Sequence, residues 1–420
     1  MDLELVTIGT ELLLGFTVDT NSAFLGQALA EVGVRITRRT SVPDEPAAVA
    51  EAVHEALQRS RLVITTGGLG PTRDDLSKHA VAELYGLPLE FHPEIWDAMV
   101  ARFARMGRKL SERNRCQAEV PRGAVVLPNP RGTAPGLWIT GEPGEVIMLP
   151  GVPGEMRGLV RSEVVPRLAR RTTGRVVRSL VLRTTAIAES ALAERLEPVE
   201  DTLAPLTLAY LPSLEGVDLR LTAWDAEPAE ADQLLSAAAT RLRRQVAEHV
   251  YGGGGEDLAA VLLEAYRREG VRLVLAESCT GGMLGERLTA IPGSSDVFLG
   301  GLIAYADAVK QELGVPSRIL QEHGAVSEET VREMALRVRA RFAASVGLAV
   351  SGIAGPGGGS PEKPIGLVWF GVADGTGCET YKMIFPGSRH EIRVRAAQYA
   401  LWRLWRRSAA AVLPDAATRL

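Results

Sequence analysis

The chain has 420 residues, of which 46% are apolar and 23% are charged, so its composition excludes the disordered, collagen-like and coiled-coil classes. Its length exceeds the size at which a single hydrophobic core stops growing, and we expect two or three compact domains. The formal net charge of -4 gives no general attraction to phosphate backbones, so nucleic acid is not an expected partner. Cys116, Cys279 and Cys378 are odd in number and lack metal-type spacing, which argues against disulfides and structural zinc.

Nothing in the sequence indicates a membrane protein. No apolar run approaches the roughly 20 residues that a membrane-spanning helix needs. The first residues also lack the basic region followed by an apolar one that marks a secretory signal. We therefore expect a cytoplasmic enzyme with no membrane partner.

The first third of the chain alternates short β-branched runs with amphipathic stretches. Strands are predicted over 3–8, 34–38 and 62–66, and helices over 21–32 and 46–57. This βαβαβ order predicts a parallel sheet.

A glycine-rich loop follows the third of these strands. It contains Gly67, Gly68 and Gly70, and Asp74 and Asp75 are expected to open a helix that ends near residue 86. Ligands of open α/β sheets bind at the carboxyl ends of strands, so the loop is a candidate site. Its amides could hold a phosphate if a divalent cation bridged the carboxylates and the phosphate oxygens. The alternative is that one aspartate only caps the helix.

The rest of the chain divides into a small middle module and a third domain. Helices over 93–106 and 153–171 flank a strand-rich section that ends at 145–151, and we place the end of the first domain, 1–172, there. Within 173–250 the predicted elements are a strand, a helix, two strands and a helix, at 176–183, 189–196, 206–210, 217–223 and 229–246. The glycine run at 251–255 cannot form a helix or strand without a large entropic cost, and we interpret it as a linker.

The third domain, 256–420, is again α/β. Its predicted strands are 272–276, 297–305, 347–350, 365–372 and 379–385. Its predicted helices are 258–269, one after Thr280, 308–313, one capped by Ser327, and 390–410.

A hydroxyl-rich turn joins the first strand of this domain to a helix. It contains Ser278, Thr280, Gly281 and Gly282, and free amides at a helix start can hold a phosphate or a developing oxyanion. Spacing alone favours the simpler interpretation that Ser278 or Thr280 caps the helix. Cys279 is a rival nucleophile, because a thiolate at a helix start is stabilised, although a small buried cysteine is the commoner outcome.

Tyr305 and Lys310 lie at the end of the next strand and one turn into the following helix. Together with Ser278 they could form a hydrolytic set. A desolvated lysine loses its proton more readily, and it could take the hydroxyl proton of Ser278 through or beside the phenol. The alternative is a solvated Lys310, as for most helical lysines.

Two further features could recognise a substrate. Ser351 and Gly352 open a glycine-rich segment, 351–359, which either lets a ligand approach the backbone or forms a flexible surface loop. Arg389 and Arg393 share a helical face and could grip a phosphate, although solvated arginines are the default.

Together these motifs resemble the competence-damage-inducible protein A (CinA) family. The matching segments are 276–282, 300–301 before Tyr305 and Lys310, 324–327, and 351–359 with 363–364. The resemblance implies hydrolysis of nicotinamide mononucleotide to nicotinic acid mononucleotide and ammonia, without an organic cofactor. It implies Ser278 as the nucleophile, assisted by Tyr305 and Lys310, and argues against Cys279.

The first domain resembles the molybdopterin-binding-type domain of the same family, through 8–13, 19–21, 65–75, 129–136 and 149–156. For it the family implies metal-dependent cleavage of ADP-ribose to AMP and ribose 5-phosphate. Asp74 and Asp75 are then candidate ligands of Mg²⁺, Mn²⁺ or Co²⁺. The candidate substrate-binding residues, by motif membership, are Gly67, Gly68, Gly70, Glu11, Asn21 and Glu155, of which the last three are also candidates for activating water.

The predicted fold class is therefore α/β, with two α/β domains joined by a small α+β module. That module is similar to a KH-like region but lacks the G-x-x-G clamp that grips a nucleic-acid backbone. Domain packing or dimerisation is its expected task, and we expect a homodimer because the module has little core of its own. Two other functions stay open: an N-terminal domain that binds a pterin or nucleotide without hydrolysis, and a DNA-uptake or repair accessory protein.

Overall fold

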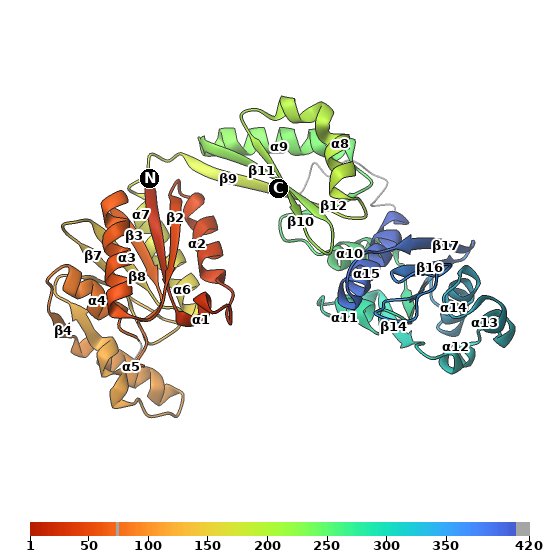
Figure 1. Cartoon of the computed structure of the whole chain (residues 1–420), viewed down its shortest axis with the longest axis horizontal. Coiled ribbons are helices and arrows are strands. Elements are labelled where there is room, and N and C mark those ends of the chain that lie inside the picture. Colours follow the sequence, from red (N-terminus) through yellow and green to blue (C-terminus); the bar gives the residue numbers. More distant parts are fainter. Residues whose placement is uncertain (73–74, 409–420) are drawn as a thin grey trace. The chain divides into compact units, whose positions relative to one another are not determined.

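The computed structural model describes residues 1–72 and 75–408 (Figure 1). Contacts divide this part of the chain into two compact units. The first combines Met1–Arg178 with Ala223–Gln233, and the second combines Ser179–Thr222 with the chain from Leu234 onward. The helices found in the described residues are not long and apolar enough to cross a membrane.

The first unit contains a six-stranded sheet in the order β2-β1-β3-β8-β7-β6. Its strands are β1 (Asp2–Ile8), β2 (Arg35–Val42), β3 (Leu62–Thr66), β6 (Val125–Leu127), β7 (Gly136–Thr140) and β8 (Glu145–Leu149). The first four strands of this order are parallel, as predicted, but β7 and β6 pair antiparallel. The predicted parallel sheet is therefore corrected to a mixed one. The cause is the tight turn between β7 and β8, closed by the bond from Gly141 N to Gly144 O, because such a turn can join only antiparallel strands.

Helices cover both faces of this sheet (Figure 1). They are α1 (Thr10–Leu13), α2 (Thr20–Ala30), α3 (Pro46–Arg59), α4 (Ser77–Leu84), α5 (Pro93–Arg105), α6 (Pro153–Leu159) and α7 (Val165–Ala169). One apolar core lies under α3 and α4, and a second lies under α2 and α6. A small sheet of β4 (Leu89–Phe91) and β5 (Glu119–Pro121) lies outside the main one. The loops after β1, β3 and β8 consequently meet at the carboxyl edge of the parallel strands.

The helix expected to open at Asp74 and Asp75 begins later. Asp74 lies outside the described residues, and α4 starts at Ser77 without a side-chain cap. Asp75 instead accepts hydrogen bonds from the backbone amide, at 2.9 Å, and the hydroxyl of Thr72. It therefore closes the loop rather than capping the helix.

The middle module forms a four-stranded sheet in the order β10-β11-β9-β12, with two helices. The elements are β9 (Val176–Thr184), α8 (Glu189–Glu200), β10 (Thr207–Pro212), β11 (Val217–Ala226), α9 (Pro228–Gln245) and β12 (Val250–Gly253). The last strand corrects the prediction of a linker, since Gly252 pairs with Arg183 and Gly253 with Leu182. Pairing with an existing sheet offsets the entropic cost of ordering these glycines.

The C-terminal sheet has the order β14-β13-β15-β16-β17. Its strands are β13 (Leu273–Glu277), β14 (Phe298–Ile303), β15 (Val346–Gly352), β16 (Leu367–Asp374) and β17 (Gly377–Ile384). Strands β14, β13 and β15 are parallel, and β16 and β17 continue the sheet antiparallel. Ligands of such a sheet are expected at the carboxyl ends of the three parallel strands.

Helices flank this sheet as well. They are α10 (Leu258–Glu269), α11 (Met283–Thr289), α12 (Asp307–Leu313), α13 (Ser317–His323), α14 (Glu328–Arg341) and α15 (Arg389–Arg406). One core lies under α10, α11 and α15, and another under α12 to α14. Ser327 caps α14, as predicted, by accepting a bond from Thr330 N at 3.2 Å. The sequence did not predict α13.

Within the second unit, the part of the middle module that belongs to it packs on the C-terminal domain. Trp402 Nε1 donates to the carbonyl of Glu248 at 3.0 Å, and its ring lies parallel to that of His249 with centroids 5.9 Å apart. Gln398 Nε2 donates to the hydroxyl of Thr185 at 3.2 Å. These contacts fit the packing task expected of the module, and dimerisation stays a prediction.

Candidate active sites

A cavity of about 180 Å³ lies at the carboxyl ends of β13, β14 and β15. Its lining residues are Ser278, Cys279, Tyr305, Lys310, Ala325, Val326, Ser351, Gly352, Ala354 and Arg389. The fold thus brings the three predicted members of the hydrolytic set, Ser278, Tyr305 and Lys310, to one cavity, the first from the end of β13 and the other two from the loop after β14 and the helix α12 that follows it.

Ser278 follows β13 directly, and its backbone amide donates to Val350 O at 2.9 Å, so its main chain is fixed by the neighbouring strand. Its hydroxyl makes no hydrogen bond to the described part of the chain, and neither it nor Thr280 caps α11. The expectation of a hydroxyl cap is therefore wrong. Glu277 takes that role, as its carboxylate accepts the amide of Gly282 at 3.0 Å. This role of Glu277 was not predicted, because the residue ends the preceding strand and lies outside the positions from which a capping side chain is usually expected.

Lys310 is only 1% exposed, which excludes the solvated alternative. Its Nζ donates to the carbonyl oxygen of Tyr305 at 2.8 Å and lies 3.7 Å from Asp307 Oδ1. Burial lowers the pKa of Lys310 from its usual value, and the Asp307 carboxylate opposes that shift. A lysine in this position is closer to the neutral, proton-accepting form than a surface lysine is.

Tyr305 lies at the mouth of the cavity, with 58% of its surface exposed. Its phenol oxygen accepts a bond from Arg389 at 3.0 Å, and Arg389 also donates to Gly355 O at 2.7 Å. Arg393 donates to Thr280 O at 2.7 Å and so braces the turn that carries Ser278. Both predicted arginines thus have protein partners, and of the two only Arg389 lines the cavity.

Cys279 also lines the cavity, but burial raises the pKa of its thiol to about 12. The thiolate, which is the nucleophilic form, is therefore strongly disfavoured at neutral pH. This agrees with the buried, inert interpretation of the cysteine and not with the rival nucleophile.

The glycine-rich loop after β15 contributes its first residues to the cavity. Ser351 Oγ donates to Ala325 O at 2.7 Å and joins the loop to the start of the α14 segment. A Cβ added at Gly352 would lie 2.7 Å from Leu367 O, so this glycine allows close approach of the chain to itself.

In the first unit, the predicted residues gather at the carboxyl ends of β1, β3 and β8. Gly67 has φ +113°, and an added Cβ would lie 2.1 Å from Ile8 O. At Gly68 an added Cβ would lie 1.7 Å from Ser77 Oγ, and at Gly70 it would lie 2.4 Å from Asp75 Oδ2. The glycines of this loop therefore serve close packing within the domain.

The polar side chains at this edge bind the loops to one another. Asn21 Nδ2 donates to Thr66 Oγ1 at 3.2 Å and to Gly151 O at 2.8 Å, while its Oδ1 is buried without a partner. Glu155 accepts from Asn129 Nδ2 at 2.7 Å. Glu11 is exposed on α1. In the described chain the buried side-chain oxygens at this edge that lack a protein partner are Asn21 Oδ1, Thr65 Oγ1 and Ser77 Oγ.

The residues described at this edge do not by themselves form a metal site. No group of three or more His, Cys, Asp or Glu side chains within 1–72 and 75–408 is placed to hold an ion. Of the two predicted ligands, Asp75 is described and already accepts bonds from Thr72. Asp75 alone therefore does not make up a cation site.

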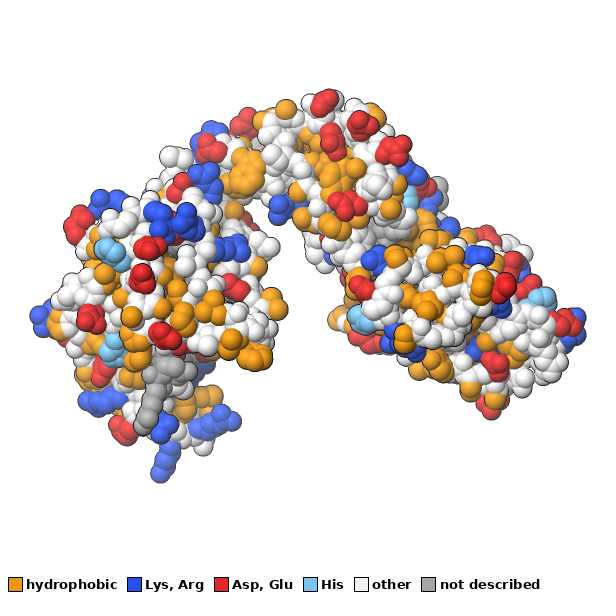
Figure 2. Space-filling model, in the orientation of Figure 1, with side chains coloured by type: hydrophobic (Ala, Val, Ile, Leu, Met, Phe, Trp, Pro, Cys, Tyr) orange, Lys and Arg blue, Asp and Glu red, His pale blue; other side chains and the backbone are white. Residues whose placement is uncertain are grey.

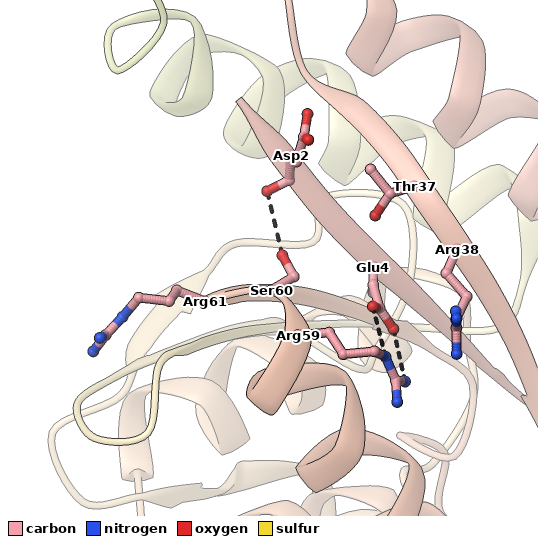
Figure 3. Close-up of a pocket in the computed structure, with 7 residues that line it drawn as sticks. All are labelled: Asp2, Glu4, Thr37, Arg38, Arg59, Ser60 and Arg61. Atoms are coloured by element: carbon pink, nitrogen blue, oxygen red, sulfur yellow. Dashed lines mark hydrogen bonds and ion pairs between the residues drawn. The ribbon is translucent and has the colours of Figure 1, made fainter.

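A second, open hollow of about 520 Å³ lies at the opposite edge of the first sheet, where β1 begins (Figure 3). It is lined by Asp2, Glu4, Thr37, Arg38, Arg59, Ser60 and Arg61. Figure 3 shows Glu4 joined to Arg59 by two bonds, each of 2.9 Å. None of the predicted site residues lies there. Lys and Arg side chains are interspersed with Asp and Glu over the face of the protein in Figure 2, without a continuous basic stripe on that face.

Three consecutive segments of the chain each match a model of a known protein family. Residues 4–170 match the family model described as "Probable molybdopterin binding domain", 179–252 match "Damage-inducible protein CinA KH domain", and 255–407 match "CinA C-terminal domain".

Full-length relatives agree with these matches. A CinA-like protein of Gemmatimonas aurantiaca is 50% identical over 411 residues, covering 97% of this chain and 96% of that protein. One from Parasynechococcus marenigrum is 46% identical and covers 90% of each. The crystal structure of competence damage-inducible protein A from Klebsiella pneumoniae is 37% identical, covers 36% of this chain and 94% of that one, and has a TM-score of 0.35. The chain therefore belongs to the CinA family, with an N-terminal molybdopterin-binding-type domain, a KH domain and a C-terminal CinA domain.

Proposed function

We propose that the chain is a bifunctional hydrolase of pyridine-nucleotide metabolism, and that its C-terminal domain deamidates nicotinamide mononucleotide. The observation that carries this proposal is the cavity in which Ser278 and the buried Lys310 meet beside Tyr305. A hydroxyl nucleophile needs a nearby base, and the lowered pKa of Lys310 suits that task.

In the proposed reaction, Ser278 Oγ attacks the carboxamide carbon of the substrate while its proton passes to neutral Lys310, directly or through the Tyr305 phenol. The amides of Cys279 and Thr280 have no backbone acceptor in the described chain, and they can stabilise the oxyanion. Ammonia leaves with a proton returned from Lys310. Water then hydrolyses the acyl-serine and releases nicotinic acid mononucleotide.

Arg389 is proposed to receive the phosphate of the nucleotide. Among the residues that line the cavity, the cationic side chains are Arg389 and Lys310. Because Lys310 is the proposed base, Arg389 is the one that can bind the phosphate. A guanidinium suits a phosphate because it can donate two parallel bonds.

The test is release of ammonia and nicotinic acid mononucleotide by the full chain. Ser278→Ala is expected to lower kcat by about 10³-fold or more. Cys279→Ala, a change of the adjacent residue in the same cavity, is expected to retain activity. A fully active Ser278→Ala variant would refute the assignment of the nucleophile.

For the N-terminal domain we propose cleavage of ADP-ribose to AMP and ribose 5-phosphate. This part rests on the family resemblance. Asp75, with Asp74 outside the described residues, would hold a divalent cation, which would neutralise charge on the pyrophosphate. Glu11, Asn21 and Glu155 remain the proposed groups for substrate and water.

AMP formation from ADP-ribose, measured with Mg²⁺, Mn²⁺ or Co²⁺, tests this part. The wild-type chain is expected to form AMP and Asp75→Ala is not. No AMP from the wild type with any of the three cations would favour the alternative, a domain that binds a pterin or nucleotide without hydrolysing it.

A further inference from the structure

Glu277 is a buried carboxylate at the base of the turn that carries Ser278. It is the last residue of β13 and is only 2% exposed. Its Oε2 accepts the backbone amides of Gly282 at 3.0 Å and Leu284 at 3.1 Å, and its Oε1 accepts that of Gly285 at 2.9 Å. Three charge-assisted bonds therefore satisfy one carboxylate that has little access to water.

These amides are the otherwise unpaired donors at the start of α11. The cap residue, Gly282, has no side chain to accept them, and the carboxylate replaces the missing cap. One side chain thereby joins the end of β13 to the beginning of α11, across residues 278–281. The turn between them contains Ser278 and the amides of Cys279 and Thr280 proposed to stabilise the oxyanion.

The same contact decides where an anion can bind. A helix start attracts anions through its free amides and its dipole. At α11 the Glu277 carboxylate already occupies these amides, so they are not available to a substrate phosphate. This leaves Arg389 to receive the substrate phosphate and keeps the turn available for the reacting carboxamide.

We propose that Glu277 is a positioning residue for the amidase reaction, which rests on the function proposed above. Its carboxylate is bonded to the amides of the α11 start, and Glu277 is not among the residues that line the cavity. It acts by fixing the path of residues 278–281, on which the nucleophile and the oxyanion donors both depend.

Glu277→Gln in the full chain tests this role. Glutamine has the same shape, but its NH₂ group is a donor and cannot accept a bond from a backbone amide. The variant therefore loses at least one of the three bonds. Because an error of about 1 Å in catalytic geometry costs on the order of 100-fold in rate, kcat is expected to fall by about 10- to 100-fold with KM within about twofold. Hydrogen exchange at Gly282, Leu284 and Gly285 should become faster.

Glu286→Gln is the matched control, because it makes the same chemical change on an exposed residue of the same helix. It should leave kcat, KM and exchange unchanged. Glu277→Asp is the second variant. It keeps the charge but withdraws the carboxylate, and it should also lower kcat with KM preserved.

Two failures are distinguishable. An active wild type with an equally active Glu277→Gln or Glu277→Asp variant would overturn the role of Glu277 and leave the proposed function intact. A wild type that releases no ammonia would overturn the proposed function and this role with it. A loss of activity that appears entirely as raised KM would also contradict positioning of the nucleophile.

Discussion

Lys310 Nζ donates a hydrogen bond to the main-chain carbonyl of Tyr305 at 2.8 Å, while the Tyr305 phenol accepts one from Arg389. The amine and the phenol are therefore held independently. A neutral amine that donates one hydrogen to a carbonyl keeps its lone pair for a proton. The two side chains should consequently contribute to catalysis to different extents.

The first prediction separates these contributions. Lys310→Met fills a similar volume without an ionisable group, and it should lower kcat for ammonia release by about 10³-fold or more, because the base is lost. Tyr305→Phe preserves the bond between Lys310 and the carbonyl, and it should cost about 10- to 100-fold. Equal losses in the two variants would show that the proton must pass through the phenol.

The second prediction concerns the pH dependence. Lys310 must be neutral to accept a proton, so kcat should rise with pH through the pKa of Lys310, which burial lowers. Asp307, 3.7 Å away, raises that pKa. Asp307→Asn should therefore move the rising limb of the kcat profile to lower pH. The exposed Glu312→Gln, on the same helix, should leave it in place. A limb that moves to higher pH in Asp307→Asn would contradict Lys310 as the base.

Periodicity in the sequence predicted most helices and strands, because the apolar residues that form the cores recur at helical or strand spacing. It failed at β12, where pairing with β9 orders glycines that have no strand propensity of their own. It also failed for the direction of β7, since that direction depends on the tight turn between β7 and β8, whose geometry is not encoded in periodicity.

For the C-terminal site, the sequence predicted which residues take part but not how they are buried or bonded. The identities of Ser278, Tyr305 and Lys310 came from motifs, but the burial of Lys310 depends on packing between α12 and α14 and could not be inferred locally. The partners of Arg389 likewise come from segments far away in the sequence. Spacing assigned the helix cap to a hydroxyl, whereas the longer Glu277 reaches the same amides from the preceding strand.

The third prediction tests why the N-terminal loop contains glycine. Gly67→Ala places a Cβ 2.1 Å from Ile8 O at a φ of +113°. Strain and displacement of β1 should lower the free energy of unfolding by about 3 kcal/mol or more. Gly86→Ala is the control, because Gly86 also has positive φ but nothing lies within 4 Å of the added Cβ. It should cost about 1 kcal/mol. Urea unfolding of both variants measures the difference, and equal costs would favour a purely ligand-related need for Gly67.

The last prediction concerns the packing of the middle module on the C-terminal domain. His249 is buried against Trp402, and its Nδ1 lies 3.0 Å from the carbonyl of Thr185. Burial lowers the pKa of His249 from 6.5, although Glu248 opposes the shift. The unfolded chain therefore binds a proton more readily than the folded one in the range below about pH 6.5. The histidine's contribution to stability is complete above that pH and is lost as the pH falls.

Calorimetry at pH 8 and pH 5.5 tests this assignment. The Tm of the wild type should fall more between the two pH values than that of His249→Phe, which keeps an aromatic ring against Trp402 but cannot titrate. His390→Gln removes an exposed histidine from the same unit, and it should show the wild-type pH dependence. If His249→Phe loses as much Tm as the wild type on acidification, protonation of His249 does not control this interface.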